Sequence, residues 1–179
     1  VADISKEEGV ELDASSADLV ALLGDGSFRD TLGILQKVLS SAGTKISLAD
    51  VEKITGAPRT RIINDMVEAI GRKESEKALL AVQNAVEQNV DMNICMKLIL
   101  EKLRFIMLLR AAPSMAKQIE TQVSAEDFAW LKSLAAEQNL NISSAVLLEM
   151  LNAYERTGKA YLPHLPLELA LVNVMRQDN

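Results

Sequence analysis

Residues 92–112 read MNICMKLILEKLRFIMLLRAA, and wound as a helix this stretch is apolar around most of its circumference. One narrow polar stripe runs along it, made by Asn93, Lys97, Glu101 and Arg104. A helix of this kind is buried on several sides, either in the middle of a bundle or between subunits. Asp91 precedes it, and aspartate is a favoured N-cap residue. The stretch therefore predicts a helical protein built around a helix that begins after Asp91.

The composition of the whole chain also favours helices. Of its 179 residues, 49% are hydrophobic and only 3% are aromatic. Leu, Ile, Val, Ala and Met supply the apolar mass, which favours helices over strands, and no alternating strand pattern is found. The net charge of −6 argues against a chain that mainly contacts nucleic-acid phosphates. No apolar run approaches the ~18–20 residues of a membrane span.

Helical periodicity begins near the N-terminus. We expect a stub ending near residues 8–9, a helix over 16–23 and a longer helix after Ser27 with Gly43 as its stop. The apolar stripe of that longer helix consists of Phe28, Leu32, Leu35, Leu39 and Ala42. Ser47 and Asp50 form a capping box for a short helix that closes at Gly56.

The sequence GAPRTR, residues 56–61, combines a helix stop with Pro58 and is the predicted domain boundary. It divides the chain into a small N-terminal part, residues 1–57, and a second domain, residues 58–179. The second domain is expected to hold longer helices, which are residues 62–71, 78–86, 91–112, 124–137, 143–156 and a last helix opening at Pro166.

Residues that could carry catalysis are scarce. The chain has no GxxxxGK[ST], GxSxG or HExxH motif. His164 lies between a proline and a leucine and is interpreted as a loop residue. Cys95 is interpreted as a small buried hydrophobe, and a single cysteine excludes an intrachain disulfide. We predict no catalytic residue, no metal site and no enzymatic activity for this chain.

Arg29 breaks a local rule. Ser27 and Asp30 resemble a capping-box pair, which places Arg29 in the first helical turn, where a cation costs roughly 0.3–1 kcal/mol against the helix dipole. The spacing also points Arg29 away from the core face of its own helix. Arg29 is either a surface residue paired with Asp25 or Asp30, or a cation placed for a ligand outside its helix.

The segment GDGSFRDTLGILQKV, residues 24–38, resembles the lid of the clamp-loader branch of AAA+ ATPases, where an arginine opens a lid helix. The flanks KEEGVELD and ISLADVEKITGAP, the stretch from AIGRKESEKALL onward and the closing YLPHLPLELALV resemble the gamma/tau subunits of bacterial DNA polymerase III. This resemblance covers nearly the whole chain and implies an all-α fold. It implies a truncated three-helix lid over residues 1–57, then a helical-bundle collar over residues 58–179 that assembles subunits.

The resemblance also implies site residues. Arg29 would be the sensor-2 arginine that reaches the ATP phosphates in a preceding ATPase domain, with Ser27 and Asp30 holding the helix start. The collar contacts are expected on the helix over residues 91–112 and on the last two helices. The candidate interface residues are Leu98, Leu103, Ile106, Leu151, Leu167 and Leu171.

The implied partners are other clamp-loader subunits: copies of this chain and the delta and delta-prime types. DNA and the sliding clamp would be met only through the parent assembly, in the bacterial cytoplasm and without a membrane. The nucleotide-binding domain with its Walker motifs is absent from the residues given, so no cofactor is expected here and ATP-Mg belongs to the parent ATPase. Two alternatives remain: a replication factor C-like or other AAA+ relative, and a helical adaptor without an ATPase parent.

Overall fold

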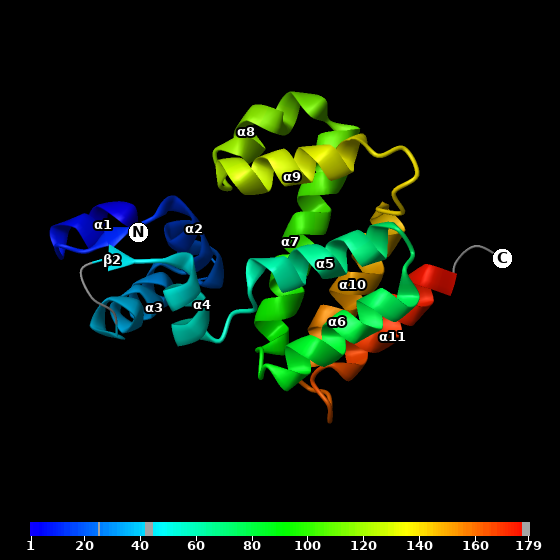
Figure 1. Cartoon of the computed structure of the whole chain (residues 1–179), viewed down its shortest axis with the longest axis horizontal. Coiled ribbons are helices and arrows are strands. Elements are labelled where there is room, and N and C mark those ends of the chain that lie inside the picture. The colour runs from blue at the N-terminus through cyan, green and yellow to red at the C-terminus, as the bar shows by residue number, and fades with distance from the viewer. Residues whose placement is uncertain (25, 42–44, 177–179) are drawn as a thin grey trace.

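The structure is a computed structural model that describes residues 1–24, 26–41 and 45–176. Within these ranges it is almost entirely helical, which confirms the all-α prediction (Figure 1). The expected helix stop at Gly43 lies outside the described residues. Two clusters of buried hydrophobic residues form: one is built from residues up to Ala57 and the other from Ile62 onward. We refer to residues 1–57 as the N-terminal unit and to residues 58–179 as the bundle.

The N-terminal unit holds more elements than the sequence predicted. Its elements are α1 (Ala2–Glu7), β1 (Glu11–Leu12), α2 (Ala14–Leu23), α3 (Phe28–Ser41), β2 (Lys45–Ile46) and α4 (Leu48–Thr55). The short segment expected to end near residues 8–9 is helix α1. The described part of the unit therefore has a fourth helix, where the resemblance implied three. The strands β1 and β2 pair in parallel, with Glu11 opposite Lys45. Two-residue strands are too short to produce an alternating pattern, which is why the sequence did not reveal them.

The bundle is a closed arrangement of five long helices. They are α5 (Thr60–Gly71), α6 (Ser75–Glu87), α7 (Met92–Ala111), α10 (Ser144–Thr157) and α11 (Leu165–Arg176). Each contacts the next in the order α5, α6, α11, α10 and α7, and α7 contacts α5 again (Figure 1). A short 3-10 turn (Pro113–Met115), α8 (Ala116–Glu120) and α9 (Ala125–Ala136) form an arm that returns along α7.

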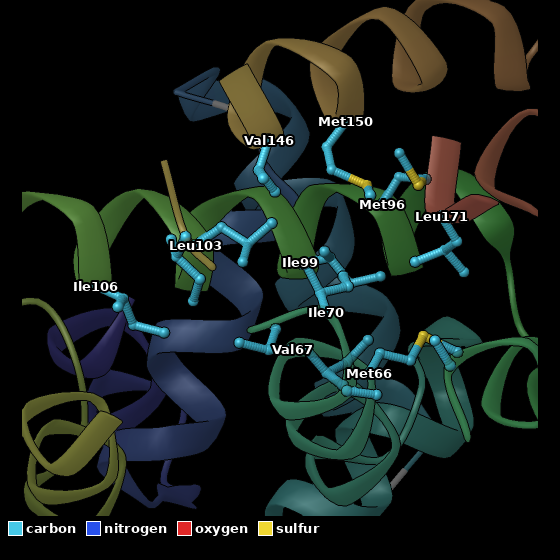
Figure 2. Close-up of a cluster of buried hydrophobic side chains, with 14 of the residues drawn as sticks. Met66, Val67, Ile70, Met96, Ile99, Leu103, Ile106, Val146, Met150 and Leu171 are labelled. Carbon is cyan, nitrogen blue, oxygen red and sulfur yellow. The ribbon is translucent and has the colours of Figure 1, made fainter. Parts of the chain in front are cut away.

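Helix α7 is the central helix that the sequence predicted. The Asp91 carboxylate caps it by accepting bonds from the backbone N–H groups of Asn93 and Ile94, at 2.8 and 3.1 Å. Figure 2 shows side chains of α7 meeting those of α5, α10 and α11 in one apolar cluster. Helix α9 packs along α7 as well, and Ile94 and Leu98 of α7 contact the core of the N-terminal unit. Every other helix that the structure describes is thus packed directly or indirectly on α7.

A short junction that hydrogen bonds hold in place joins the two units. Gly56 ends α4 with a φ of +75°, a conformation that favours glycine. The Glu52 carboxylate of α4 accepts bonds from the backbone N–H and the hydroxyl of Thr60, at 3.0 and 3.3 Å, and so caps the start of α5. The backbone N–H of Asp91 donates to the Gly56 carbonyl at 3.2 Å.

Replacing Leu103, which is fully buried, tests the central role of α7. We expect Leu103→Ala to lower the free energy of unfolding by about 2–5 kcal/mol, because it removes apolar contacts and leaves a cavity. Leu80→Ala on the exposed face of α6 is the control and should change it by less than about 0.5 kcal/mol. Urea denaturation measures both. Equal effects would contradict the assignment of α7 as the centre of the core.

Candidate functional site

The start of α3 holds the residues of the predicted nucleotide sensor. The Ser27 hydroxyl oxygen accepts a bond from the backbone N–H of Asp30 at 3.3 Å, as an N-cap does. The N–H of Ser27 donates to the Gly24 carbonyl at 2.8 Å rather than to the Asp30 carboxylate, so one half of the expected pair forms. A Cβ at Gly24 would collide with the Thr31 side chain, which explains a glycine where α2 meets the start of α3.

Arg29 and Phe28 both lie on the surface. The Arg29 side chain is exposed, and among the described residues no carboxylate forms an ion pair with it; Asp25 is outside those residues. Phe28 is 73% exposed, so its expected place in the core stripe of α3 is wrong. The core of the N-terminal unit takes Leu35 and Val38 from α3, and the first turn of the helix extends beyond that core. An aromatic ring and a guanidinium are therefore presented side by side at the positive end of α3.

The six predicted interface residues divide by exposure. Four lie inside the core of the bundle with almost no exposed surface: Leu103, Ile106, Leu167 and Leu171. They cannot touch a partner directly, because their neighbours in this chain already surround them. Leu98 is half-buried and packs against the cores of both units. Leu151 is 45% exposed on α10 and is available for contact.

Exposed apolar side chains gather at two grooves of the bundle. The first, the α7–α10 groove, has a volume of about 530 Å³ and is lined by Leu100, Met107, Leu147, Leu148 and Leu151, with Glu101 and Arg104 among them. Leu148 is 59% exposed there. The second, the α6–α11 groove, has a volume of about 760 Å³ and is lined by Glu76, Leu79, Leu80, Gln83, Val86, His164 and Glu168. Leu80 is more than half exposed in this groove.

A polar network that the sequence did not predict ties α9 to α7 and α5. Lys102 is almost fully buried on α7 and binds the Asp127 carboxylate at 2.9 Å. Its Nζ also lies 5.0 Å from the centroid of the Trp130 ring, a cation–π contact. The Trp130 Nε1–H donates to Glu68 at 3.0 Å, and Glu68 pairs with Arg72 at 2.8 Å. The sequence contained one signal for this network, which was the position of Lys102 on the apolar face of the central helix.

A cleft of about 520 Å³ separates the N-terminal unit from the bundle. Helices α2, α5, α7 and α9 line it, together with Leu48 of α4. Burial, with additional repulsion from Asp127 and Asp18, raises the pKa of Glu101 to about 7, although Lys102 and Arg104 act in the opposite direction. Burial and the Asp127 charge also raise the pKa of Asp18 on the opposite wall. Glu101 lines both this cleft and the α7–α10 groove.

Cys95 and His164 lie in different surroundings. Cys95 is fully buried, its Sγ lies 3.9 Å from the Met66 sulfur, and burial raises the pKa of the thiol to about 12. His164 is half-buried at the α6–α11 groove. The described part of the chain contains no group of three or more His, Cys, Asp or Glu residues that could hold a metal ion. No helix in that part is long and apolar enough to span a membrane.

Comparison with known proteins decides the family. The profile described as DNA polymerase III subunits gamma and tau domain III matches residues 46–179. The chain belongs to this family. The match includes the whole bundle and the closing LPLELALV segment, the feature that favours the bacterial gamma/tau subunits over other AAA+ relatives. It also includes β2 and α4, so the family domain begins within the N-terminal unit.

The curated relatives include bacterial gamma/tau subunits and a replication factor C subunit. The chain is 23% identical over 176 residues to DNA polymerase III subunit tau of Bacillus subtilis, covering 96% of this chain and 30% of that protein. It is 27% identical over 119 residues to the gamma/tau subunit of Mycobacterium tuberculosis, covering 66% and 21%. Replication factor C subunit 4 of Encephalitozoon cuniculi is 34% identical over 89 residues, covering 50% and 28%. The chain thus spans less than a third of the length of these relatives.

A solved structure has a similar fold. The DNA clamp loader delta protein of Bacillus subtilis aligns with a TM-score of 0.54 and 18% sequence identity, over 98% of this chain and 54% of that chain. At this identity the likeness concerns the fold alone. The alignment nevertheless extends over both the N-terminal unit and the bundle.

Glu101 gives a testable pH dependence of stability. Because its pKa rises from 4.5 to about 7 in the folded chain, the folded state binds an additional proton between these pH values. The free energy of unfolding should therefore fall as the pH rises from 4.5 to about 7. One pKa unit corresponds to roughly 1.4 kcal/mol, and partial exposure reduces the expected loss to about 1–2 kcal/mol.

Glu101→Gln should remove this loss and stabilise the chain above pH 7, as measured by urea denaturation across the pH range. Glu126→Gln, an exposed glutamate at the same cleft, is the matched control and should leave the loss in place. A Glu101→Gln chain that loses stability over the same range would contradict the assignment.

Proposed function

We propose that this chain is the lid and collar portion of a gamma/tau subunit of the bacterial clamp loader, the assembly that places a sliding clamp on DNA. The observation that carries the proposal is the family match over the whole bundle, together with two exposed apolar grooves on that bundle. In this role the N-terminal unit senses ATP and the bundle holds the subunits together. ATP hydrolysis would take place in a preceding ATPase domain of the parent subunit, which would also bind ATP and Mg²⁺.

The position of Arg29 supports a role as sensor-2. A guanidinium suits phosphate recognition because its planar donors match phosphate oxygens. At the start of α3 it is exposed, it forms no ion pair with the described residues, and Ser27 fixes the helix start beneath it. The neighbouring Phe28 ring adds an apolar surface that a preceding domain would cover. These features suit contact with a nucleotide bound outside this chain.

The two grooves support a role in assembly. Each is apolar with a few charged residues, and the two lie on different helix pairs of the same bundle. Two different surfaces on one subunit permit head-to-tail association, which builds a ring when the rotation closes. Stable interfaces of this kind bury about 2,000 Å² or more. The partners would be copies of this chain and delta-type subunits, in the cytoplasm, with DNA and the clamp reached through the assembly.

A second candidate function is a role in the clamp loader of another branch of the AAA+ ATPases. Replication factor C subunit 4 of Encephalitozoon cuniculi shares 34% identity over half of the chain, so the lid and collar could serve another AAA+ clamp loader. Reconstitution distinguishes the two readings, because a gamma/tau chain should assemble with bacterial delta and delta-prime subunits.

The assembly role predicts which surface substitutions matter. Leu151→Glu in the α7–α10 groove and Leu80→Glu in the α6–α11 groove should each weaken self-association or binding to delta-type subunits at least tenfold, because they place a charge in an apolar contact. Sedimentation over a wide concentration range measures this. Phe28→Glu, a more exposed apolar site on the N-terminal unit, is the control. Unchanged assembly of both groove variants, with their folds intact, would rule out these surfaces.

The sensor role predicts a separate loss. In the intact parent subunit, Arg29→Ala should reduce ATP-dependent clamp loading at least tenfold while leaving subunit assembly unchanged, because it removes a phosphate contact and no core contact. Lys37→Ala, an exposed cation further along α3, is the matched control. Loading at the unmodified rate by the Arg29→Ala subunit would refute the role.

A further inference from the structure

The contacts between the N-terminal unit and the bundle are concentrated at one end. The strong helix–helix contacts among the described residues lie within each unit. The Glu52–Thr60 and Gly56–Asp91 hydrogen bonds join the units beside the junction, and Ile94 and Leu98, in the first two turns of α7, pack against the core of the N-terminal unit. The cleft of about 520 Å³ begins at the junction, where Pro58 and Thr60 line it, and α2 and α9 border it farther away. Contacts at one end and an open gap at the other are the arrangement of a hinge.

The two walls of the cleft carry charge of the same sign. Of the described residues that line it, Asp18 on α2 is the one charged residue of the N-terminal unit. Glu101 on α7 and Asp127 on α9 lie on the bundle wall. Asp127 already holds Lys102 at 2.9 Å, whereas no hydrogen bond or ion pair to a described residue satisfies the Glu101 carboxylate. Closing the cleft would bring like charges together and remove water from Glu101, and both effects oppose closure.

We propose that the charge on Glu101 sets the width of this cleft, so that the N-terminal unit closes on the bundle when Glu101 is neutral and opens when it is ionised. Neutral Glu101 can lose water at low cost and does not repel Asp18. The raised pKa of Glu101, about 7, places the change near neutral pH. The position of the N-terminal unit thereby becomes adjustable by protons, or by any group that neutralises Glu101, without a change in either core.

The groups around Glu101 determine the sign of the effect. On its own helix α7, Lys102 and Arg104 stabilise the ionised form. On α2 and α9, Asp18 and Asp127 destabilise it, and Glu126 adds a further carboxylate to the same cleft. On α5, the cleft is lined by Glu68, Asp65 and Arg61, of which Arg61 and Asp65 face each other at 3.9 Å. The α10 residues in the neighbouring groove, Ser144, Leu147, Leu148 and Leu151, carry no charge.

A distance measurement across the cleft tests the proposal on the 179-residue chain. Lys37→Cys on α3 and Lys132→Cys on α9 introduce two exposed thiols for spin labels, while buried Cys95 stays unlabelled. Double electron–electron resonance then gives the label separation. We expect the separation to increase from about pH 5.5 to about pH 8.5, with a midpoint near 7. At the higher pH, roughly 1 M salt should shorten it, because the Debye length falls to about 3 Å.

Three variants separate the proposed cause from a general effect of pH. Glu101→Gln should keep the short separation at both pH values, and Asp18→Asn should reduce the opening at high pH. Glu126→Gln, at the same cleft, should retain the full change. A separation that does not respond to pH, or the same response in Glu101→Gln, overturns the proposal. Circular dichroism confirms that each variant is folded, and Asp18→Asn provides the test if Glu101→Gln is not.

Discussion

Burial of α7 is the constraint on which the rest of the structure depends. Its apolar side chains contact α5 and α10 in the bundle, α9 of the arm and the core of the N-terminal unit. A twenty-residue helix that is apolar on most sides cannot remain in water, because every exposed apolar area costs free energy. The neighbouring helices are therefore held in place because they bury the apolar surface of α7. Their own exposed faces become the outer surface of the bundle.

The few charges on α7 acquire their roles from this central position. Lys102 enters the apolar face, and its burial is tolerated because Asp127 and the Trp130 ring both receive the ammonium. Glu101 lies on the narrow polar stripe, and the packing of the N-terminal unit beside α7 makes this residue part of the wall of a cleft. Arg104 follows it at the α7–α10 groove. One stripe thus borders both the contact between the two units and a surface proposed for subunit assembly.

The residues of the N-terminal unit that are proposed to bind a ligand lie away from its core. Its small core uses the middle of α3, so the first turn projects, with Phe28 and Arg29 exposed. Gly24 and Ser27 hold that turn, the first by allowing close approach to Thr31 and the second by capping the helix. A cation at the positive end of a helix is unfavourable for the isolated unit. The role proposed for Arg29 explains this position of the cation, because its ligand would be bound by another part of a longer protein.

The sequence by itself determined the long helices, most of their caps and the family resemblance, because these depend on local spacing and on motif order. Asp91, Ser47 and Ser124 cap helices where expected, since an N-cap needs only neighbouring backbone groups. Tertiary structure alone decided which apolar residues are free for contact. Leu103 and Leu171 share their residue type and helical spacing with Leu148 and Leu151, and only the packing of the surrounding helices buries the first pair and exposes the second. The partner of Lys102 and the acidic cleft could not be predicted from the sequence, because their members are far apart in the chain and meet only when α2, α7 and α9 come together.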